Sequence, residues 1–168
     1  KKFLRRIDGI EAFSDYITPV HDYIYDNVYI GNALKIIEKE GMNYDLVLLI
    51  DVLEHFDKAQ GRDLINKILK ISKGVLISIP KDIGVQEDAF ENVYETHRAN
   101  WTQKELSQIG CHYFQYDDAN HIVYIGTEEE VLKIKNKYPL KLRIRKFVMS
   151  IPVLYPALRF IKKTVIFK

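Results

Sequence analysis

The apolar run Leu46–Ile50, bounded by Asp45 and Asp51, constrains the fold more than any other part of the sequence. Five consecutive apolar residues without polar alternation are typical of a strand that is buried on both faces of a parallel sheet. The apolar residues of Asp57–Ser72 recur at helical spacing and predict an amphipathic helix. A second buried strand is expected at Val75–Ile79. This order of strand, helix and strand predicts an α/β fold built on a mostly parallel sheet.

Further strands are expected before and after this strand–helix–strand segment in the sequence. Two short apolar segments precede it, and an antiparallel hairpin follows it, because the turn Asp117–Asn120 joins two more strand-like segments. These four strands are expected at residues 3–10, 27–30, 112–116 and 121–125. A helix over Trp101–Ile109 precedes the hairpin, with Thr102 as its N-cap and Glu105 completing a capping box. The antiparallel pair is therefore expected at one edge of the parallel sheet.

Composition excludes several other classes of protein. A length of 168 residues suits one domain with a substantial core. The single cysteine, Cys111, excludes an intrachain disulfide framework and a cysteine-based zinc site, and it fits the reducing conditions of the cytoplasm. No apolar run in the sequence is long enough to span a bilayer. Because the first residue is Lys1 and not methionine, we expect further chain upstream.

Charge is distributed unevenly along the chain. Of the 25 basic residues, 11 follow Glu130, so residues 1–130 hold 14 basic residues and all 23 acidic ones, a net charge of −9. We therefore separate an α/β body, residues 1–126, from a basic C-terminal helical extension, residues 127–168. Such a segment can pack on the body, or it can lie on an anionic membrane surface. Nucleic-acid binding is disfavoured, because the body is acidic and the extension matches no recognised nucleic-acid-binding module.

The residues at the strand ends carry a resemblance to a known family. The stretches concerned are DGIE (8–11), GNA (31–33), DVLEHF (51–56), SIPK (78–81) and ETHRANW (95–101). In order and spacing they resemble class I S-adenosylmethionine-dependent methyltransferases, over about residues 7–126. The resemblance implies a Rossmann-like sheet, S-adenosylmethionine as the cofactor, and transfer of its methyl group to a small-molecule or glycan acceptor.

The resemblance also implies which residues contact the cofactor. Glu11 would accept hydrogen bonds from the ribose hydroxyls, and Asn32 with the backbone amide of Ala33 would meet the adenine. Asp51 and Glu54 would border the same cleft, because open α/β folds bind ligands at the carboxyl ends of their strands. The simpler interpretations are that Glu11 caps the helix after it and that Asn32 is an ordinary turn residue.

His97 and His55 are the candidate catalytic residues. The resemblance implies that they lie near the mouth of the cleft, where a neutral imidazole can accept a proton from a substrate hydroxyl or amine. The simpler interpretation is that both histidines cap helices while Trp101 packs in the core. The five histidines are scattered along the sequence, so no metal site is expected.

The resemblance begins at the family's second strand. The family's first strand and its glycine-rich loop, which approaches the methionine part of the cofactor, have no counterpart in this sequence. A gap is therefore expected in the middle of the sheet, with unpaired backbone groups on two strands. Either upstream residues fill the gap, or the chain is a non-catalytic methyltransferase-like binding module. A nicotinamide oxidoreductase is a further alternative, but it also needs a glycine-rich turn and does not predict the terminal hairpin.

Overall fold

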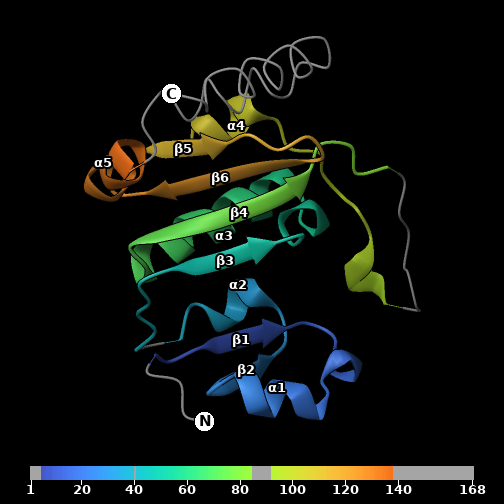
Figure 1. Cartoon of the computed structure of the whole chain (residues 1–168). Coiled ribbons are helices and arrows are strands. Elements are labelled where there is room, and N and C mark those ends of the chain that lie inside the picture. Colours follow the sequence, from blue (N-terminus) through green and yellow to red (C-terminus); the bar gives the residue numbers. More distant parts are fainter. Residues whose placement is uncertain (1–4, 40, 85–91, 138–168) are drawn as a thin grey trace, which may run out of the picture.

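The computed structural model describes residues 5–39, 41–84 and 92–137, and its strands form two sheets (Figure 1). The first sheet is a parallel pair, β1 (Asp8–Glu11) and β2 (Asn27–Ile30). The second sheet has the order β3-β4-β6-β5. Its strands are β3 (Val47–Ile50), β4 (Gly74–Pro80), β5 (His112–Gln115) and β6 (Asn120–Gly126). β3 is parallel to β4, and β6 is antiparallel to β4 and β5, so the predicted α/β sheet with an antiparallel terminal hairpin is confirmed.

The sheet is interrupted between β1 and β3. No backbone hydrogen bond joins these two strands within the described ranges, although Figure 1 shows them pointing in the same direction. The interruption lies where the resemblance places the family's first strand, so the expected gap is confirmed. Across it, Tyr44 Oη donates to Asp8 Oδ2 at 2.7 Å. Burial and this hydrogen bond raise the pKa of Tyr44 to about 12.

β3 is buried on one face only, which corrects the expectation of burial on both faces. Leu49 is 6% exposed, but its neighbours Leu48 and Ile50 are 57% and 48% exposed. Successive side chains of a strand point to opposite faces of the sheet, so one face carries Leu49 and the other carries Leu48 and Ile50. The Leu49 face belongs to the core cluster, whereas the described residues leave the other face open to solvent.

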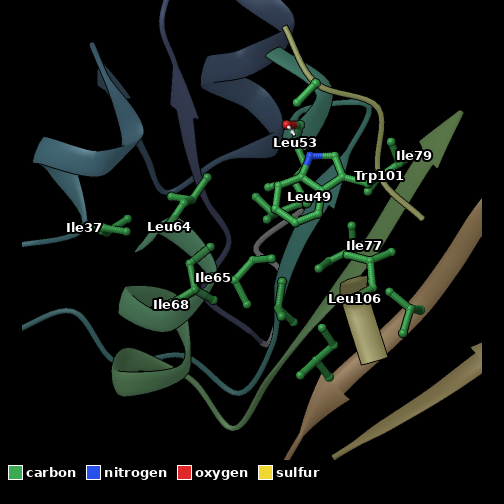
Figure 2. Packing of buried hydrophobic residues seen from close by; sticks show 14 residues of the cluster. Ile37, Leu49, Leu53, Leu64, Ile65, Ile68, Ile77, Ile79, Trp101 and Leu106 are labelled. Atoms are coloured by element: carbon green, nitrogen blue, oxygen red, sulfur yellow. Dashed lines mark hydrogen bonds between the residues drawn. The ribbon is translucent and has the colours of Figure 1, made fainter. Parts of the chain in front are cut away.

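The helix α3 (Lys58–Ile71) packs on the second sheet and supplies much of the core. Asp57 caps its first turn, because its side chain accepts a hydrogen bond from Gln60 N at 2.8 Å. The apolar face predicted from the sequence is buried, with Leu64 and Ile65 at 0% exposure. Figure 2 shows these side chains and the indole of Trp101 in one cluster with residues of β3 and β4. Trp101 is also 0% exposed, so it belongs to the core and not to the helix that follows it.

The remaining helices are short. They are α1 (Pro19–Ile24), α2 (Ala33–Ile36), α4 (Gln103–Ser107) and α5 (Glu128–Lys137), with 3-10 turns η1 (Ser14–Tyr16), η2 (Leu53–His55) and η4 (Val93–Glu95). The capping box predicted before the hairpin is present at α4. Thr102 Oγ1 accepts from Glu105 N at 3.3 Å, and Glu105 Oε2 accepts from Thr102 N at 2.9 Å. The helix begins after Thr102, two residues later than the expected start at Trp101.

Lys58 ties the start of α3 to the start of α4. Its Nζ donates to Glu105 Oε1 at 2.7 Å and lies 4.6 Å from the centroid of the Trp101 ring. The hydrogen bonds from Lys58 and then from Thr102 lower the pKa of Glu105 to about 2. The indole of Trp101 is therefore covered on its outer side by an ion pair.

Most of the basic extension lies outside the described residues. Only α5 is described, and it places Glu128, Glu129 and Glu130 in its first turn and Lys135 and Lys137 in its last, which complements the helix dipole. The predictions for residues 138–168, including contact with a membrane surface, stay predictions, as does the division at residues 126 and 127. Within the described part of the chain, no helix is long and apolar enough to cross a membrane.

A substitution at Gly61 tests the packing of α3 under Trp101. A Cβ at this position would lie 2.5 Å from Trp101 Cζ2. We expect Gly61→Ala to lower the free energy of unfolding by about 1–3 kcal/mol through overpacking. The clash outweighs the gain of about 1 kcal/mol in helix propensity that alanine brings. Urea unfolding followed by far-UV circular dichroism measures the change. Asn66→Ala, on the exposed side of α3, is the control, and an equal effect at both positions would contradict the predicted contact.

A second prediction concerns the pH dependence of stability. The pKa of Glu105 in the folded protein is about 2, below its ordinary value of 4.5, so its contribution to the free energy of unfolding is present above about pH 4.5 and is lost as the pH falls toward 2. Glu105→Gln should therefore lower the free energy of unfolding at pH 7 by about 1 kcal/mol, as for a lost cap and surface ion pair. The difference from the unsubstituted protein should shrink below about pH 4.5. Chemical unfolding at several pH values measures it, and in a Lys58→Met background the same substitution should cost less.

Candidate functional site

A hollow of about 380 Å³ lies at the carboxyl ends of β1, β2 and β3. Glu11 ends β1, Asn32 follows β2 and Asp51 follows β3, and all three line this hollow. The rest of the lining comes from Ile10, Ala12, Gly31, Ala33, Val52, His55, Phe56, Gln60, Asn92, Tyr94, Glu95 and Arg98. The strand ends identified in the sequence therefore converge on one space, whereas their contact with a ligand stays a prediction.

Glu11 is the half-buried last residue of β1. Its Oε1 accepts a hydrogen bond from Phe13 N at 2.8 Å, which holds the carboxylate at the rim of the hollow. Phe13 is the N-cap residue of η1, and no side chain caps that turn. Within the described chain, Oε2 is left as the oxygen that can accept hydrogen bonds from a ligand.

Asn32 begins the turn from β2 into α2. The preceding Gly31 has a φ of +133°, a conformation that L side chains rarely adopt. Asn32 Oδ1 accepts a hydrogen bond from Leu34 N at 2.9 Å and so caps the helix, a role more specific than that of the ordinary turn residue in the simpler interpretation. Its side-chain amide nitrogen remains as a donor beside the hollow. Ala33 is the first residue of α2, where a backbone N–H has no acceptor within the helix.

Asp51 has an unusual backbone conformation at the end of β3. Its φ is +51°, in the left-handed region that residues other than glycine seldom occupy. Asp51 N still donates to Ser78 O at 3.0 Å, so the parallel pairing with β4 continues up to this residue before the chain turns away. Such outliers occur preferentially at functional sites, where the surrounding structure enforces them. Here the turn directs Asp51 and Val52 into the lining of the hollow.

Three hydrogen bonds to backbone carbonyl oxygens of η2 hold the chain that follows η4 against it. Arg98 N and Ala99 N donate to Glu54 O at 2.8 and 3.2 Å. Trp101 Nε1 donates to Leu53 O at 3.3 Å, and Figure 2 shows the indole beside Leu53. We call these three bonds the η2 clasp. Because Trp101 is buried, the clasp fixes the position of the residues just before it.

The clasp brings His97 next to His55. Their ring centroids are 5.1 Å apart. His55 Nδ1 lies 3.3 Å from Thr96 O, and His97 Nδ1 lies 2.5 Å from Ile83 O. His55 lines the hollow, whereas His97 lies next to His55 and is not part of the lining. The simpler interpretation of His97 as a helix cap is wrong, because Thr102 is the N-cap of α4.

Glu54 is placed differently from the other predicted cofactor residues. Its side chain is 1% exposed and does not line the hollow. Burial raises the pKa of Glu54, and its own backbone amide and the neighbouring His55 only partly offset this effect. Its Oε2 has no hydrogen-bond partner among the described residues. The predicted set therefore divides into five residues that line the hollow and two, Glu54 and His97, that lie behind His55.

Glu54, His55 and His97 form a cluster of side chains that can act as metal ligands. One ligand atom from each of Glu54, His55 and His97 lies within 4.8 Å of the other two. No metal site was expected from the sequence, because the histidines are scattered along it. Two of the five histidines are nevertheless close in the structure, because the η2 clasp brings His97 next to His55.

The segment before Trp101 supplies lining residues that the sequence analysis missed. Asn92 and Tyr94 precede the stretch ETHRANW (95–101) and were not expected at the site, yet both line the hollow, as does Glu95 of that stretch. Asn92, 1% exposed, caps η4 by accepting a hydrogen bond from Tyr94 N at 3.0 Å. An aromatic residue two positions after an asparagine was the available signal, because Asn commonly forms such local turns.

Comparison with known proteins identifies the fold. No family model matches the sequence, and no curated protein matches it. Among solved structures, the chain is similar to a candidate O-methyltransferase from Nostoc punctiforme PCC 73102, at 17% identity and a TM-score of 0.51, covering 73% of this chain and 45% of that one. It is similar to PigF with SAH at 12% identity and a TM-score of 0.50, covering 72% of this chain and 43% of that one.

A third solved structure, the N-terminal domain of EvdMO1 in the presence of SAH and D-fucose, is 12% identical with a TM-score of 0.50, covering 73% of this chain and 66% of that one. This chain therefore spans less than half of the first two proteins and about two thirds of the third. At these identities the likeness concerns the fold: the chain has the Rossmann-like fold of class I methyltransferases, with the family's first strand absent from the described residues.

Proposed function

We propose that this chain is part of an S-adenosylmethionine-dependent methyltransferase and that its hollow binds the nucleoside part of the cofactor. The observation that carries the proposal is the convergence of Glu11, Asn32 and Asp51, from three successive strand ends, on one hollow in a methyltransferase fold. Open α/β sheets bind ligands at the carboxyl ends of their strands. The volume of about 380 Å³ lies within the range of small-molecule sites.

In this proposal the lining residues recognise ribose and adenine. A carboxylate accepts hydrogen bonds from both hydroxyls of a vicinal diol, and Glu11 offers Oε2 while Phe13 N holds Oε1. The amide of Asn32 and the backbone N–H of Ala33 are donors for the ring nitrogens of adenine. PigF and the EvdMO1 domain, which share the fold, were solved with the product cofactor S-adenosylhomocysteine.

The proposed reaction is attack of an acceptor oxygen, nitrogen or carbon on the sulfonium methyl group. The chain's main contribution is to align the acceptor with the methyl group, which lowers the barrier by several kcal/mol. His55 lines the hollow and is a proton acceptor for a substrate hydroxyl or amine. His97 does not line the hollow, and its ring lies beside that of His55, with the two centroids 5.1 Å apart.

The proposed acceptor is a small molecule or a glycan. A sugar is the favoured example, because one protein of the same fold was solved in the presence of D-fucose. The proposed location is the cytoplasm, with the basic extension as a possible contact for an anionic membrane surface, since residues after Glu130 carry no acidic side chain.

The second candidate function is a binding module without catalysis. The interruption of the sheet between β1 and β3 favours this function. The described residues place no strand and no glycine-rich turn in that gap. A module of this kind would not bind the cofactor, whereas the methyltransferase would.

Isothermal titration calorimetry with S-adenosylhomocysteine tests the proposal. We expect binding, and we expect Glu11→Ala to weaken it by about 1–3 kcal/mol, because charge-assisted hydrogen bonds to the ribose are lost. This corresponds to about 5–150-fold in Kd. Glu38→Ala is the control, since Glu38 pairs with Lys67 at the surface and does not line the hollow.

Adenosine serves as a second ligand in the same titrations. Affinity for adenosine that depends on Glu11 would assign the nucleoside part of the site to this hollow. No heat from either ligand with folded protein would remove the cofactor assignment and favour the binding module.

A further inference from the structure

Three side chains from two separate segments meet beside the hollow. Glu54 and His55 belong to η2, and His97 comes from the chain after η4. Their possible ligand atoms lie within 4.8 Å of one another. Donors around one ion at ordinary metal–ligand lengths are about 3 Å apart, so the three side chains would move closer together to hold an ion.

In both imidazoles Nδ1 faces a backbone acceptor, which leaves Nε2 as the ring nitrogen available to a metal. Each Nδ1 faces a backbone carbonyl oxygen, that of Thr96 for His55 and that of Ile83 for His97. A carbonyl oxygen only accepts hydrogen bonds, so each Nδ1 carries the proton and each Nε2 keeps its lone pair. A backbone carbonyl bound to the second ring nitrogen is the usual support of a metal-ligating histidine.

The carboxylate of Glu54 supplies an independent indication. The side chain is 1% exposed, and Oε2 has no hydrogen-bond partner among the described residues. A buried carboxylate oxygen that lacks a partner is costly, because it has lost water and gained no donor. This atom bonds to neither imidazole, so a hydrogen-bonded pair of glutamate and histidine does not explain its position. A cation held between the three side chains would compensate this buried oxygen.

We propose that Glu54, His55 and His97 bind one divalent transition-metal ion. Two imidazoles and one carboxylate suit Zn²⁺, Fe²⁺ or Mn²⁺, whereas Mg²⁺ and Ca²⁺ prefer oxygen ligands alone. Three protein ligands leave at least one coordination position open, as in catalytic sites. Because His55 also lines the hollow, the ion would lie beside it, and water or a hydroxyl group of a molecule bound there is the candidate for the open position. The metal site does not depend on the proposed cofactor, but it assigns the Nε2 lone pair of His55 to the ion, so in the metal-bound protein the proton acceptor would be a metal-bound hydroxide and not His55.

The test is calorimetric titration of tag-free, chelator-treated protein with Zn²⁺ and with Mn²⁺. We expect one ion per chain and a rise in Tm, because a ligand that binds only the folded state stabilises it. Mg²⁺ is expected to bind far more weakly. Glu54→Gln keeps the shape of the side chain, and His97→Gln removes a donor, so each should weaken binding by about 10–100-fold or more.

His112→Gln is the matched control. His112 also has its Nδ1 2.9 Å from a backbone carbonyl, that of Gly110, but it lies on β5 outside the cluster. Its substitution should leave metal binding unchanged. Circular dichroism verifies folding, and His97→Gln carries the test if Glu54→Gln does not fold.

Two results would overturn the metal site. One is the absence of binding to the unsubstituted protein, and the other is binding that persists unchanged in both Glu54→Gln and His97→Gln. Titration of the same metal-free protein with S-adenosylhomocysteine separates the two proposals, because cofactor binding without metal binding removes the metal site alone.

Discussion

The burial of Trp101 is the contact on which the arrangement of the site depends. The indole fills the space above Gly61, where a side chain would collide with it, and its Nε1 is satisfied by Leu53 O. A buried indole fixes the chain on its N-terminal side, because its hydrogen bond and its packing allow one position. Arg98 and Ala99 then reach Glu54 O, and His97 meets His55 as a consequence. The site is therefore a product of core packing, and not of the loop sequence alone.

The strongly apolar strands on both sides of the interruption have exposed faces. Leu48 and Ile50 of β3, and Ile10 of β1, are 57%, 48% and 39% exposed. Burial of such side chains normally supplies the free energy that stabilises a parallel sheet, at about 25 cal/mol per Å². In the described residues β1 pairs only with β2, and β3 pairs only with β4. The hollow lies at the ends of strands from both sheets.

The fold was predictable because its signals are local. The apolar run at Leu46–Ile50, the period of α3 and the capping box at Thr102 each act within one element. The convergence of Glu11 and Asn32 also followed, since parallel strands end at one edge of a sheet. The exposed face of β3 did not follow, because burial depends on neighbours that a local pattern cannot reveal. The resemblance placed His97 and His55 near the mouth of the same cleft, but the cluster that they form with Glu54 did not follow from the sequence, because it is set by tertiary packing around Trp101.

Glu54 shows how one residue can join the two proposed sites. In the sequence it reads as a cleft residue, because it follows a strand end closely. In the structure Asp51, with its φ of +51°, precedes η2, in which His55 lines the hollow while Glu54 is buried. A buried carboxylate is costly unless a positive charge or donors compensate it. An ion bound at Glu54 would share His55 with the hollow, so the charge that stabilises the buried carboxylate would also act on whatever oxygen the hollow presents to it.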